Sequence, residues 1–371
     1  MKDFQLRNDT KLLYRNDPAA DLETLLGGKR VLFVYGGGSA KRNGCYEDIK
    51  QAVEHAGGIL YELGGASREM AQIEEGIRLV KEHNIQLVIG AGGASIMDCA
   101  KLTAFGSCHE ENLWPYLKGE KNPYGLQKLP LVLMPAYPSS GSEYGLGAVA
   151  ADSRSGDYGT AFGIPADVAI LTPKYSLSLG TEMTAYSGLV TLVQLSASTI
   201  GDKNPVSYGI GISVIHNVLA AAKALKENPA DSDARGVILY GASISTSGRL
   251  GLGKADNYPY EIYEVEFIPE VLFGAVYRKS LTALFPRFLK AMAGYHEADI
   301  RRYFQDAFGY QGSVSESADK MTELFESLGA DMYFDGEVSA DMVKKIDIVT
   351  TLSMEELTDM VKECMVIRKR K

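Results

Sequence analysis

The sequence predicts an α/β domain with a parallel sheet, followed by an all-helical domain. Two β-branched, apolar runs, residues 31–35 and 87–89, each end in a turn of small residues that opens into a helical pattern. Such runs are typical of strands buried on both faces of a parallel sheet. The later part of the chain has long helical patterns and no convincing buried strand. We therefore expect residues 1–178 to form the α/β domain and residues 179–371 to form the helical domain.

The first domain alternates predicted strands and helices, which favours an open, mostly parallel sheet with helices on both faces. Ser67 is the expected N-cap of the second of these helices. In chain order, the predicted elements are a strand at 31–35, a helix at 46–55, a strand at 58–63, a helix at 67–83, a strand at 87–89, a helix at 96–105 and a strand at 129–135.

The second domain is predicted to contain helices only. Its last helix carries the pattern of a capping box, because Glu356 lies three positions after Ser353. The predicted helices are residues 184–198, 209–225, 232–247, 297–308, 315–328 and 354–364.

Small-residue turns follow three of the predicted strands, at residues 36–39, 90–95 and 138–143. Backbone N–H groups at the start of a helix suit phosphate, and small side chains permit its close approach. Two glycine turns of this kind indicate a nucleotide with more than one phosphate. All three turns lie at the carboxyl ends of strands, where a cleft between the two halves is expected. The structural alternative is that the glycines only permit tight connections.

Composition excludes several classes of protein. The 371 residues are 46% hydrophobic with a net charge of −9, so no basic surface indicates nucleic acid as the main partner. The four cysteines have no CxxC spacing, and no apolar run approaches the roughly 18 residues that span a bilayer. The N-terminus lacks the apolar region of a signal peptide, so we expect a cytoplasmic protein. The basic tail, residues 368–371, is interpreted as a solvated end.

The chain resembles the iron-containing (group III) alcohol dehydrogenases, most closely the butanol dehydrogenase and aldehyde reductase branch. The resemblance rests on residues 35–44, on Gly-Gly-Ala-Ser-Ile-Met-Asp-Cys-Ala-Lys at 92–101 and on residues 135–143, in that order. Residues 112–114 and 170–173 also fit. The resemblance implies a Rossmann-like domain followed by a helical one, as in the dehydroquinate synthase-like fold, and often a homodimer.

The resemblance also implies a dinucleotide cofactor. Lys41 and Arg42 follow the first turn, which has no acid for a ribose 2′-OH, so NADP(H) is favoured over NAD(H). Asp98 matches an acidic residue near the nicotinamide, and Ala136 and Tyr137 stand in a turn that is rich in threonine in the family. The expected cofactor-binding residues are Gly37, Gly38, Ser39, Gly92, Gly93, Ala94, Ser95, Asp98, Ala136, Tyr137 and Ser140.

The family's metal site does not carry over to this chain. The resemblance implies a divalent metal held by one aspartate and three histidines of the helical domain. The four matching positions hold Val190, Gln194, Glu261 and Tyr277. Valine has no donor atom, and glutamine and tyrosine are poor ligands for Fe²⁺ or Zn²⁺. We therefore expect no metal. Substitute ligands such as Glu261 and Asp256 remain an alternative.

Without a metal, hydride transfer needs another donor near the carbonyl oxygen. Tyrosine and basic residues crowd the segments around the lost ligands, and a tyrosine beside a cation is able to donate a proton. The candidate catalytic residues are Tyr260, Tyr277 and Lys279. The alternative is that these side chains only line helix contacts.

Two functions remain open from the sequence. The first is an NAD(P)H-dependent oxidoreductase, metal-independent, that acts on an alcohol, aldehyde or other small carbonyl substrate. The second is a catalytically inactive family member that binds a nucleotide or a protein partner, which the simultaneous loss of four ligands favours. Turnover with a carbonyl substrate distinguishes them.

Overall fold

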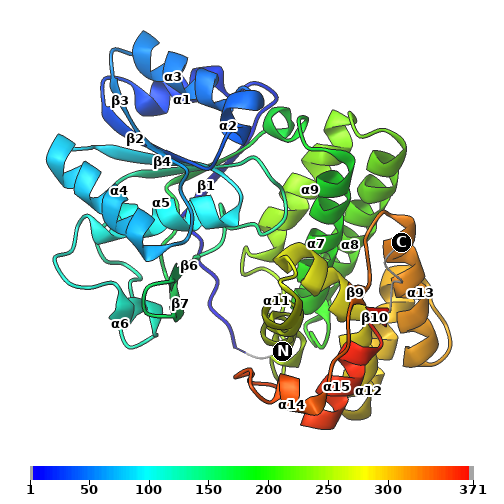
Figure 1. Ribbon diagram of the computed structural model, residues 1–371. Helices are drawn as coiled ribbons and strands as arrows, with labels where there is room; N and C mark the ends of the chain where they lie inside the picture. The colour runs from blue at the N-terminus through cyan, green and yellow to red at the C-terminus, as the bar shows by residue number, and fades with distance from the viewer. Residues whose placement is uncertain (1–2, 367–371) are drawn as a thin grey trace, which may run out of the picture. The chain divides into compact units, whose positions relative to one another are not determined.

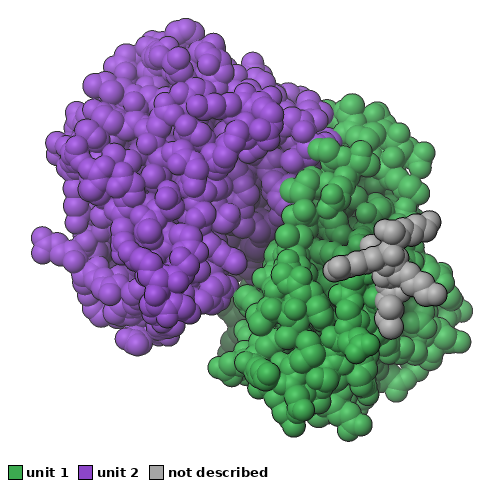
Figure 2. Space-filling view, in the orientation of Figure 1, with its two compact units in different colours: residues 1–5, 180–234, 249–371 green, residues 6–179, 235–248 purple. Residues whose placement is uncertain are grey.

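The computed structural model describes residues 3–366. The chain divides into two compact units, each coloured separately in Figure 2. The α/β unit comprises Leu6–Leu179 and Arg235–Gly248, and the helical unit comprises Met1–Gln5, Gly180–Ala234 and Arg249–Lys371. The basic tail lies outside the described residues.

A six-stranded sheet forms the centre of the α/β unit. Every strand pair in it is parallel, as the sequence predicts, so the carboxyl ends of the strands share one edge. The sheet order is β1 (Lys11–Tyr14), β8 (Val168–Leu171), β5 (Leu131–Pro135), β4 (Leu87–Gly92), β2 (Arg30–Tyr35) and β3 (Ile59–Gly64).

Helices cover both faces of this sheet (Figure 1). One face packs against α4 (Met70–His83) and α5 (Ala94–Gly106), and the other against α1 (Ala19–Leu26) and α3 (Cys45–His55). Because successive side chains of a strand point to opposite faces, β2 buries Leu32 and Val34 in one core and Phe33 in the other. This explains the continuous apolar run.

The prediction of Ser67 as the N-cap of α4 is wrong. The helix begins at Met70 with Glu69 as N-cap and no side-chain capping bond. The Ser67 hydroxyl instead accepts a hydrogen bond of 3.2 Å from the Glu69 N–H, which makes a turn ahead of the helix. The backbone at Glu69 is extended because it bridges to Ala151.

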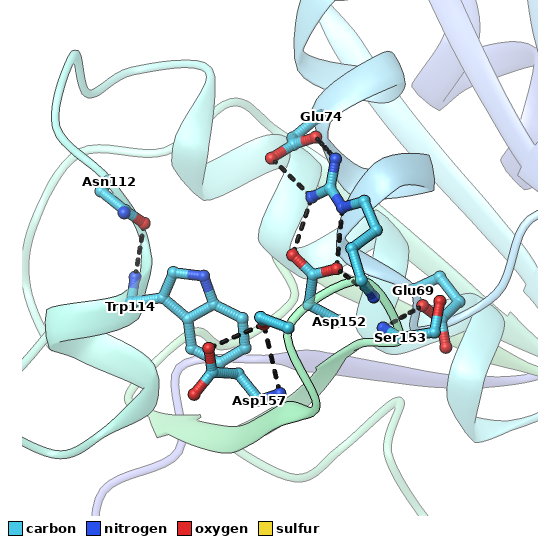
Figure 3. Close-up of polar contacts among 9 residues, drawn as sticks. Glu69, Glu74, Asn112, Trp114, Asp152, Ser153 and Asp157 are labelled. Carbon is cyan, nitrogen blue, oxygen red and sulfur yellow. Dashed lines mark hydrogen bonds and ion pairs between the residues drawn. The ribbon is translucent and has the colours of Figure 1, made fainter.

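The sequence does not predict the antiparallel hairpin of β6 (Gly147–Asp152) and β7 (Asp157–Phe162), in which half of the residues are glycine or alanine. Its turn is tied to α4 (Figure 3). The Arg154 guanidinium bridges the carboxylates of Asp152 and Glu74, and Glu69 accepts a bond from the Ser153 N–H.

Most of helix α9 (Ser232–Ser245) belongs to the α/β unit although the helical half surrounds it in sequence. Arg235 is buried, and its guanidinium donates to the Ser176 carbonyl at 2.5 Å. Gly236 leaves room for the Tyr14 hydroxyl, since a Cβ there would lie 2.2 Å from that oxygen. Residue 176 closes the short helix η1 (Pro173–Ser176), which follows β8.

Among residues 3–366, the helical unit has five helices of at least nine residues. They are α7 (Thr181–Thr199), α8 (Pro205–Glu227), α12 (Tyr277–Phe308), α13 (Val314–Ser327) and α15 (Met354–Lys362). The shorter helices are η2 (Tyr258–Glu261), α10 (Ile262–Val265), α11 (Phe267–Phe273) and α14 (Ala340–Val343). The capping box of Ser353 and Glu356 is confirmed.

Two features of the helical unit differ from the prediction. A two-residue parallel pair joins β9 (Phe334–Asp335) to β10 (Met365–Val366), where the sequence shows no strand pattern. Helix α12 also begins earlier than predicted, at Tyr277 and not at residue 297. It bends at His296, whose backbone is non-helical and whose ring stacks on Tyr258 at a centroid distance of 3.6 Å.

Helix α8 is long and apolar enough, by length and composition, to cross a bilayer. Within the helical unit it packs against α7 and α12, and its inward side chains, such as Ile215 and Val218, are buried. A core helix of a globular unit has these same properties, so the finding is weak evidence for a membrane span.

Candidate functional site

The three small-residue turns lie at one edge of the sheet. Strand β4 is central to this arrangement, because Ala91 pairs with Tyr35 of β2 and Gly92 pairs with Pro135 of β5. The Ala136 N–H donates to the Gly92 carbonyl at 3.0 Å, which fixes the third turn against the second. The register thus brings together the three turns that the sequence singles out.

The first turn is bordered by cations. Helix α2 (Ser39–Arg42) starts in it, and a Cβ at Gly38 would lie 2.7 Å from Nη1 of Arg42, so the guanidinium rests against the turn. Gly37 has open space around it. The Lys41 ammonium lies 4.7 Å from the ring centroid of Tyr46. Cations at this position suit an anionic group on the adenosine side of a dinucleotide.

The sequence reasoning missed a carboxylate next to this turn. Glu62 of β3 pairs with Phe33 of β2, two residues before the end of that strand. Its oxygens accept hydrogen bonds from the hydroxyls of Tyr35, at 2.6 Å, and Tyr46, at 2.7 Å. Strand pairing, which the linear sequence does not reveal, is what places this acid beside the turn.

The second turn is tightly packed at Gly92, whereas at Gly93 a Cβ would make only an ordinary van der Waals contact. At Gly92 a Cβ would lie 2.8 Å from Cγ1 of Ile96, and at Gly93 it would lie 4.0 Å from Tyr137 of the third turn. Ala94 already belongs to helix α5, where helical backbone angles do not require glycine, which explains the alanine at that position. Ser95 follows in the first turn of the helix.

A buried polar network lies beneath this turn. The Ser142 hydroxyl donates to Oδ1 of Asp98 at 2.7 Å. The Lys101 ammonium donates to the Ser142 hydroxyl at 3.2 Å and to the carbonyls of Gly145 and Gly147 at 2.9 and 2.7 Å. Burial raises the pKa of Asp98 and lowers the pKa of Lys101 to about 8. Asp98 thus fixes the loop after β5, and its role toward a cofactor stays a prediction.

The third turn is held by the end of helix α9. Gly141 has a left-handed φ of +66°, and a Cβ there would lie 2.1 Å from the Ala242 carbonyl oxygen. The Thr246 hydroxyl donates to the Gly141 carbonyl at 2.7 Å. Near it, the Ser140 hydroxyl accepts from the Ser142 N–H at 3.2 Å. The contact with α9 is a further reason, beyond turn geometry, for glycine in this segment.

Glu143, the last residue of the third turn, is a buried acid to which the sequence analysis assigned no role. Its Oε1 accepts a 2.6 Å hydrogen bond from the Ser243 hydroxyl, and its Oε2 has no hydrogen-bond partner among the described residues. Burial raises the pKa of this carboxyl group. The contact with residue 243 depends on a distant helix, so no local pattern signals it.

The helical unit contains the four residues that the sequence analysis matches to the family's metal ligands. Val190 and Gln194 lie buried on α7, and Tyr277 starts α12. Glu261 is engaged elsewhere, because its carboxylate accepts three hydrogen bonds of 2.6–2.7 Å from residues 350–351. Within residues 3–366, no group of three or more His, Cys, Asp or Glu side chains is placed to hold a metal ion. This donor set does not fit the family's metal.

The candidate catalytic residues lie in different surroundings. Lys279 forms an ion pair with Asp331 at 2.7 Å. Tyr260 and Tyr277 lie close to Tyr263. Burial raises the pKa of Tyr263 well above its usual value, and the other two tyrosines add smaller contributions. Tyr260 and Tyr263 stack at a centroid distance of 6.3 Å. A group of tyrosines thus occupies the region of the lost ligands.

Two residues beside Tyr260 escaped the sequence reasoning. Its hydroxyl lies 3.5 Å from Oγ of Ser198 on α7, and Nζ of Lys254 lies 4.0 Å from its ring centroid. The ammonium also donates to the Ala197 carbonyl. Burial lowers the pKa of Lys254 to about 7. Neither residue belongs to a motif, so sequence gives no signal for this grouping.

Comparison with known proteins shows which sequences and folds this chain resembles. Residues 9–173 match the model of the family described as iron-containing alcohol dehydrogenase. The chain is 25% identical over 347 residues to probable NADH-dependent butanol dehydrogenase 2 of Bacillus subtilis (strain 168), covering 89% of this chain and 87% of that protein. It is also 25% identical over 369 residues to NADPH-dependent aldehyde reductase YqhD of Escherichia coli (strain K12), covering 94% and 93%.

Among solved structures, NADH-dependent butanol dehydrogenase A from Thermotoga maritima matches with a TM-score of 0.88 at 20% identity, covering 99% of both chains. At that identity the likeness concerns the fold. Taken with the three turns at one sheet edge, these matches show that the chain is similar in its first half to the iron-containing alcohol dehydrogenase family and shares the fold of the butanol dehydrogenase structure.

Proposed function

We propose that this protein is an NADPH-dependent oxidoreductase that reduces a small aldehyde or ketone without a bound metal. The observation that carries the proposal is the set of three turns at one sheet edge, fixed to each other by the contact of Ala136 with Gly92. Family relatives are named alcohol dehydrogenases and aldehyde reductases, which supports this class of reaction.

The dinucleotide would be held by the turn residues of the α/β unit. Gly37, Gly38 and Ser39 would contact the adenosine ribose, and residues 92–95 would offer backbone N–H groups to the pyrophosphate. Asp98, Ala136, Tyr137 and Ser140 would border the nicotinamide end. When bound, the cofactor supplies a hydride, and the chain's own residues bind and orient it.

Preference for NADP(H) is supported by the guanidinium of Arg42 against the first turn and by Lys41 next to it. The carboxylate of Glu62, a group that suits a ribose 2′-OH, accepts one hydrogen bond on each oxygen, from the hydroxyls of Tyr35 and Tyr46, so a 2′-OH would have to share it with them. Relatives are named with both cofactors, so the choice depends on these residues of the chain.

Independence from metal is supported by the donor chemistry of the helical unit. Val190 has no donor atom, and the oxygens of Glu261 are engaged by residues 350–351. The second candidate function, an inactive family member that binds nucleotide or a partner, is favoured by the same replacements. We also propose that the protein is a homodimer, which light scattering of the purified protein tests, and that it is cytoplasmic, which fractionation of cells tests.

Titration with NADPH and NADH, followed by nicotinamide fluorescence, tests the cofactor. We expect NADPH to bind more tightly, and Arg42→Ala to weaken NADPH binding about 10-fold through loss of one charge-assisted hydrogen bond while NADH binding is unchanged. Lys81→Ala, at an exposed site on α4, is the control.

The same protein is then given a panel of aldehydes and ketones. Oxidation of NADPH supports the reductase, whereas cofactor binding without turnover supports the inactive family member. Failure to bind either dinucleotide contradicts both functions and leaves a structural or partner-binding role.

A further inference from the structure

We propose that a cavity within the helical unit binds a small zwitterion, a molecule that carries both a carboxylate and an ammonium group. The cavity lies between α12 and α15, which lie side by side in this unit (Figure 1). Arg287 would receive the carboxylate, and Glu355 would receive the ammonium. Both walls belong to the helical unit, so the site is independent of the dinucleotide turns and of the proposed reductase function.

The cavity is large enough for a small molecule. Its volume is about 580 Å³, within the range of pockets that hold small ligands. On the α12 wall, Lys290 follows Arg287 by three positions, so the two side chains stand on one face of the helix. On the α15 wall, Glu355 and Asp359 are four positions apart and share a face in the same way. Basic residues of one helix thus border the same space as acidic residues of the other.

Arg287 is the observation that points to an anionic group. The residue is only 6% exposed, and its Nη1 donates a 2.9 Å hydrogen bond to the Ala283 carbonyl, one turn earlier on α12. Its Cζ lies 5.4 Å from the ring centroid of Tyr333. Among residues 3–366, no carboxylate forms an ion pair with it. Burying a charge without an ionic partner costs free energy, and the remaining N–H groups of the guanidinium suit a carboxylate.

The other polar groups of the α12 wall are already paired with α15 and the residue that follows it. The Lys290 ammonium forms an ion pair with Glu363 at 3.0 Å. The Tyr295 hydroxyl donates to the carboxylate of Glu356, 3.0 Å from the nearer oxygen. Of the two cations on this wall, Arg287 is therefore the one that lacks a carboxylate.

Glu355 supplies the opposite charge. It is exposed on α15, and within the described part of the chain it has no hydrogen-bond or ion-pair partner. Asp359 pairs with Lys362 at 2.8 Å, but both side chains are exposed, and such a pair contributes little to stability. Unpaired carboxylate oxygens on this wall attract an ammonium group.

The two walls together select the class of ligand. A simple anion would pair with Arg287 but would meet the acids of α15. A simple cation would pair with these acids but would meet the guanidinium. A zwitterion presents one charge to each wall, so an amino acid satisfies both. The separation of its two charges decides which chain length fits.

A purely structural role for Arg287 is the competing explanation. Its contacts with the Tyr333 ring and the Ala283 carbonyl stabilise the packing of α12. That role accounts for the burial of the side chain. It does not account for a guanidinium that borders a cavity without a carboxylate partner, opposite an acid that has no partner either.

The test uses the full chain and four amino acids that differ in the separation of their charges: glycine, β-alanine, γ-aminobutyrate and ε-aminocaproate. Ligand-observed NMR titration measures each affinity. We expect the wild type to bind at least one of them. The analogues of the tightest binder that lack one charge, butyrate and butylamine in the case of γ-aminobutyrate, should bind about 10-fold more weakly, because each loses one charge-assisted contact.

Variants of the two walls locate the site. Arg287→Met and Glu355→Gln should each weaken binding of the tightest amino acid about 10-fold, the effect of one lost charge-assisted contact. Lys223→Met, at an exposed position of α8, is the control and should bind as the wild type does. Glu355 is exposed, so its variant keeps the test decisive if Arg287→Met does not fold, which circular dichroism checks.

Three results would overturn the proposal. A wild type that binds none of the amino acids shows that the cavity is not a zwitterion site. Butyrate or butylamine bound as tightly as γ-aminobutyrate shows that one wall alone holds the ligand. Equal affinity in the wild type, Arg287→Met and Glu355→Gln places the binding outside this cavity.

Discussion

At the scale of single residues, Gly141 is the position where the fold leaves least freedom. Its φ of +66° is left-handed, and a Cβ would lie 2.1 Å from the backbone oxygen of Ala242. Backbone is not able to move aside as the end of a flexible side chain does. The glycine is therefore required by contact with α9 as well as by the turn.

We predict that Gly141→Ala destabilises the protein by about 3 kcal/mol, the sum of left-handed strain and a forced backbone shift. Gly125→Ala is the matched control, because Gly125 has a φ of +79° but open space around it. It should cost only about 1 kcal/mol, the strain alone. Urea unfolding measures both, and equal losses would contradict the close contact.

Residue-level prediction from sequence succeeds where chemistry is local. The interpretation of Val190 as a lost ligand rests on side-chain type alone, because valine has no donor atom, and the assignment of the four ligand positions stays a prediction. Glu143, Ser198 and Lys254 were missed because their partners lie far along the chain. Their burial and contacts arise only when separate elements pack together, and no spacing rule encodes that.

At the scale of elements, Lys101 joins helix α5 to the loop after β5 and to the hairpin strand β6. Its ammonium is fully buried and donates to Ser142, Gly145 and Gly147. Removing it would leave three acceptors without this donor. These hydrogen bonds depend on a charged ammonium inside the unit. Burying such a charge costs free energy unless it is fully hydrogen-bonded.

We predict that Lys101→Met destabilises the protein by about 3 kcal/mol at pH 7, the cost of breaking a buried charged network. Burial lowers the pKa of Lys101 from 10.5 to about 8. Between these values the folded protein has released the proton and the unfolded chain has not, so wild-type stability rises with pH.

The stability difference between wild type and Lys101→Met should therefore grow from pH 8 to pH 10, as measured by urea unfolding. Lys81→Met, at an exposed site of α4, should show no such trend. A constant difference across this range would mean that Lys101 keeps its ordinary pKa in the folded protein.

Elements were predicted well where periodicity is strong. The buried strands β2 and β4 and the capping box of α15 follow from local pattern. The hairpin of β6 and β7 was missed because half of its strand residues are glycine or alanine, which have weak strand preference. The bend of α12 at His296 depends on stacking against Tyr258, which no helical pattern shows.

At the scale of the whole molecule, the two units differ in how far sequence defines their roles. The α/β unit brings the three predicted turns to one sheet edge, and its strands are parallel, as the alternation of strands with helices predicts. The sequence does not predict that Arg235–Gly248 belongs to the α/β unit, because its pattern is that of one more helix in the second half of the chain.

The chain keeps the fold of the butanol dehydrogenase structure, and the sequence predicts a different set of side chains at the positions of the family's metal ligands. Its long helices need only apolar faces to pack, so stability does not depend on the ligands.

Turnover of NADPH with the aldehyde panel, before and after treatment with a chelator and with metal content measured on the same sample, tests metal-free reduction most directly. We predict substoichiometric metal and an unchanged rate after chelation. Turnover that the chelator abolishes and that Fe²⁺ or Zn²⁺ restores would contradict it.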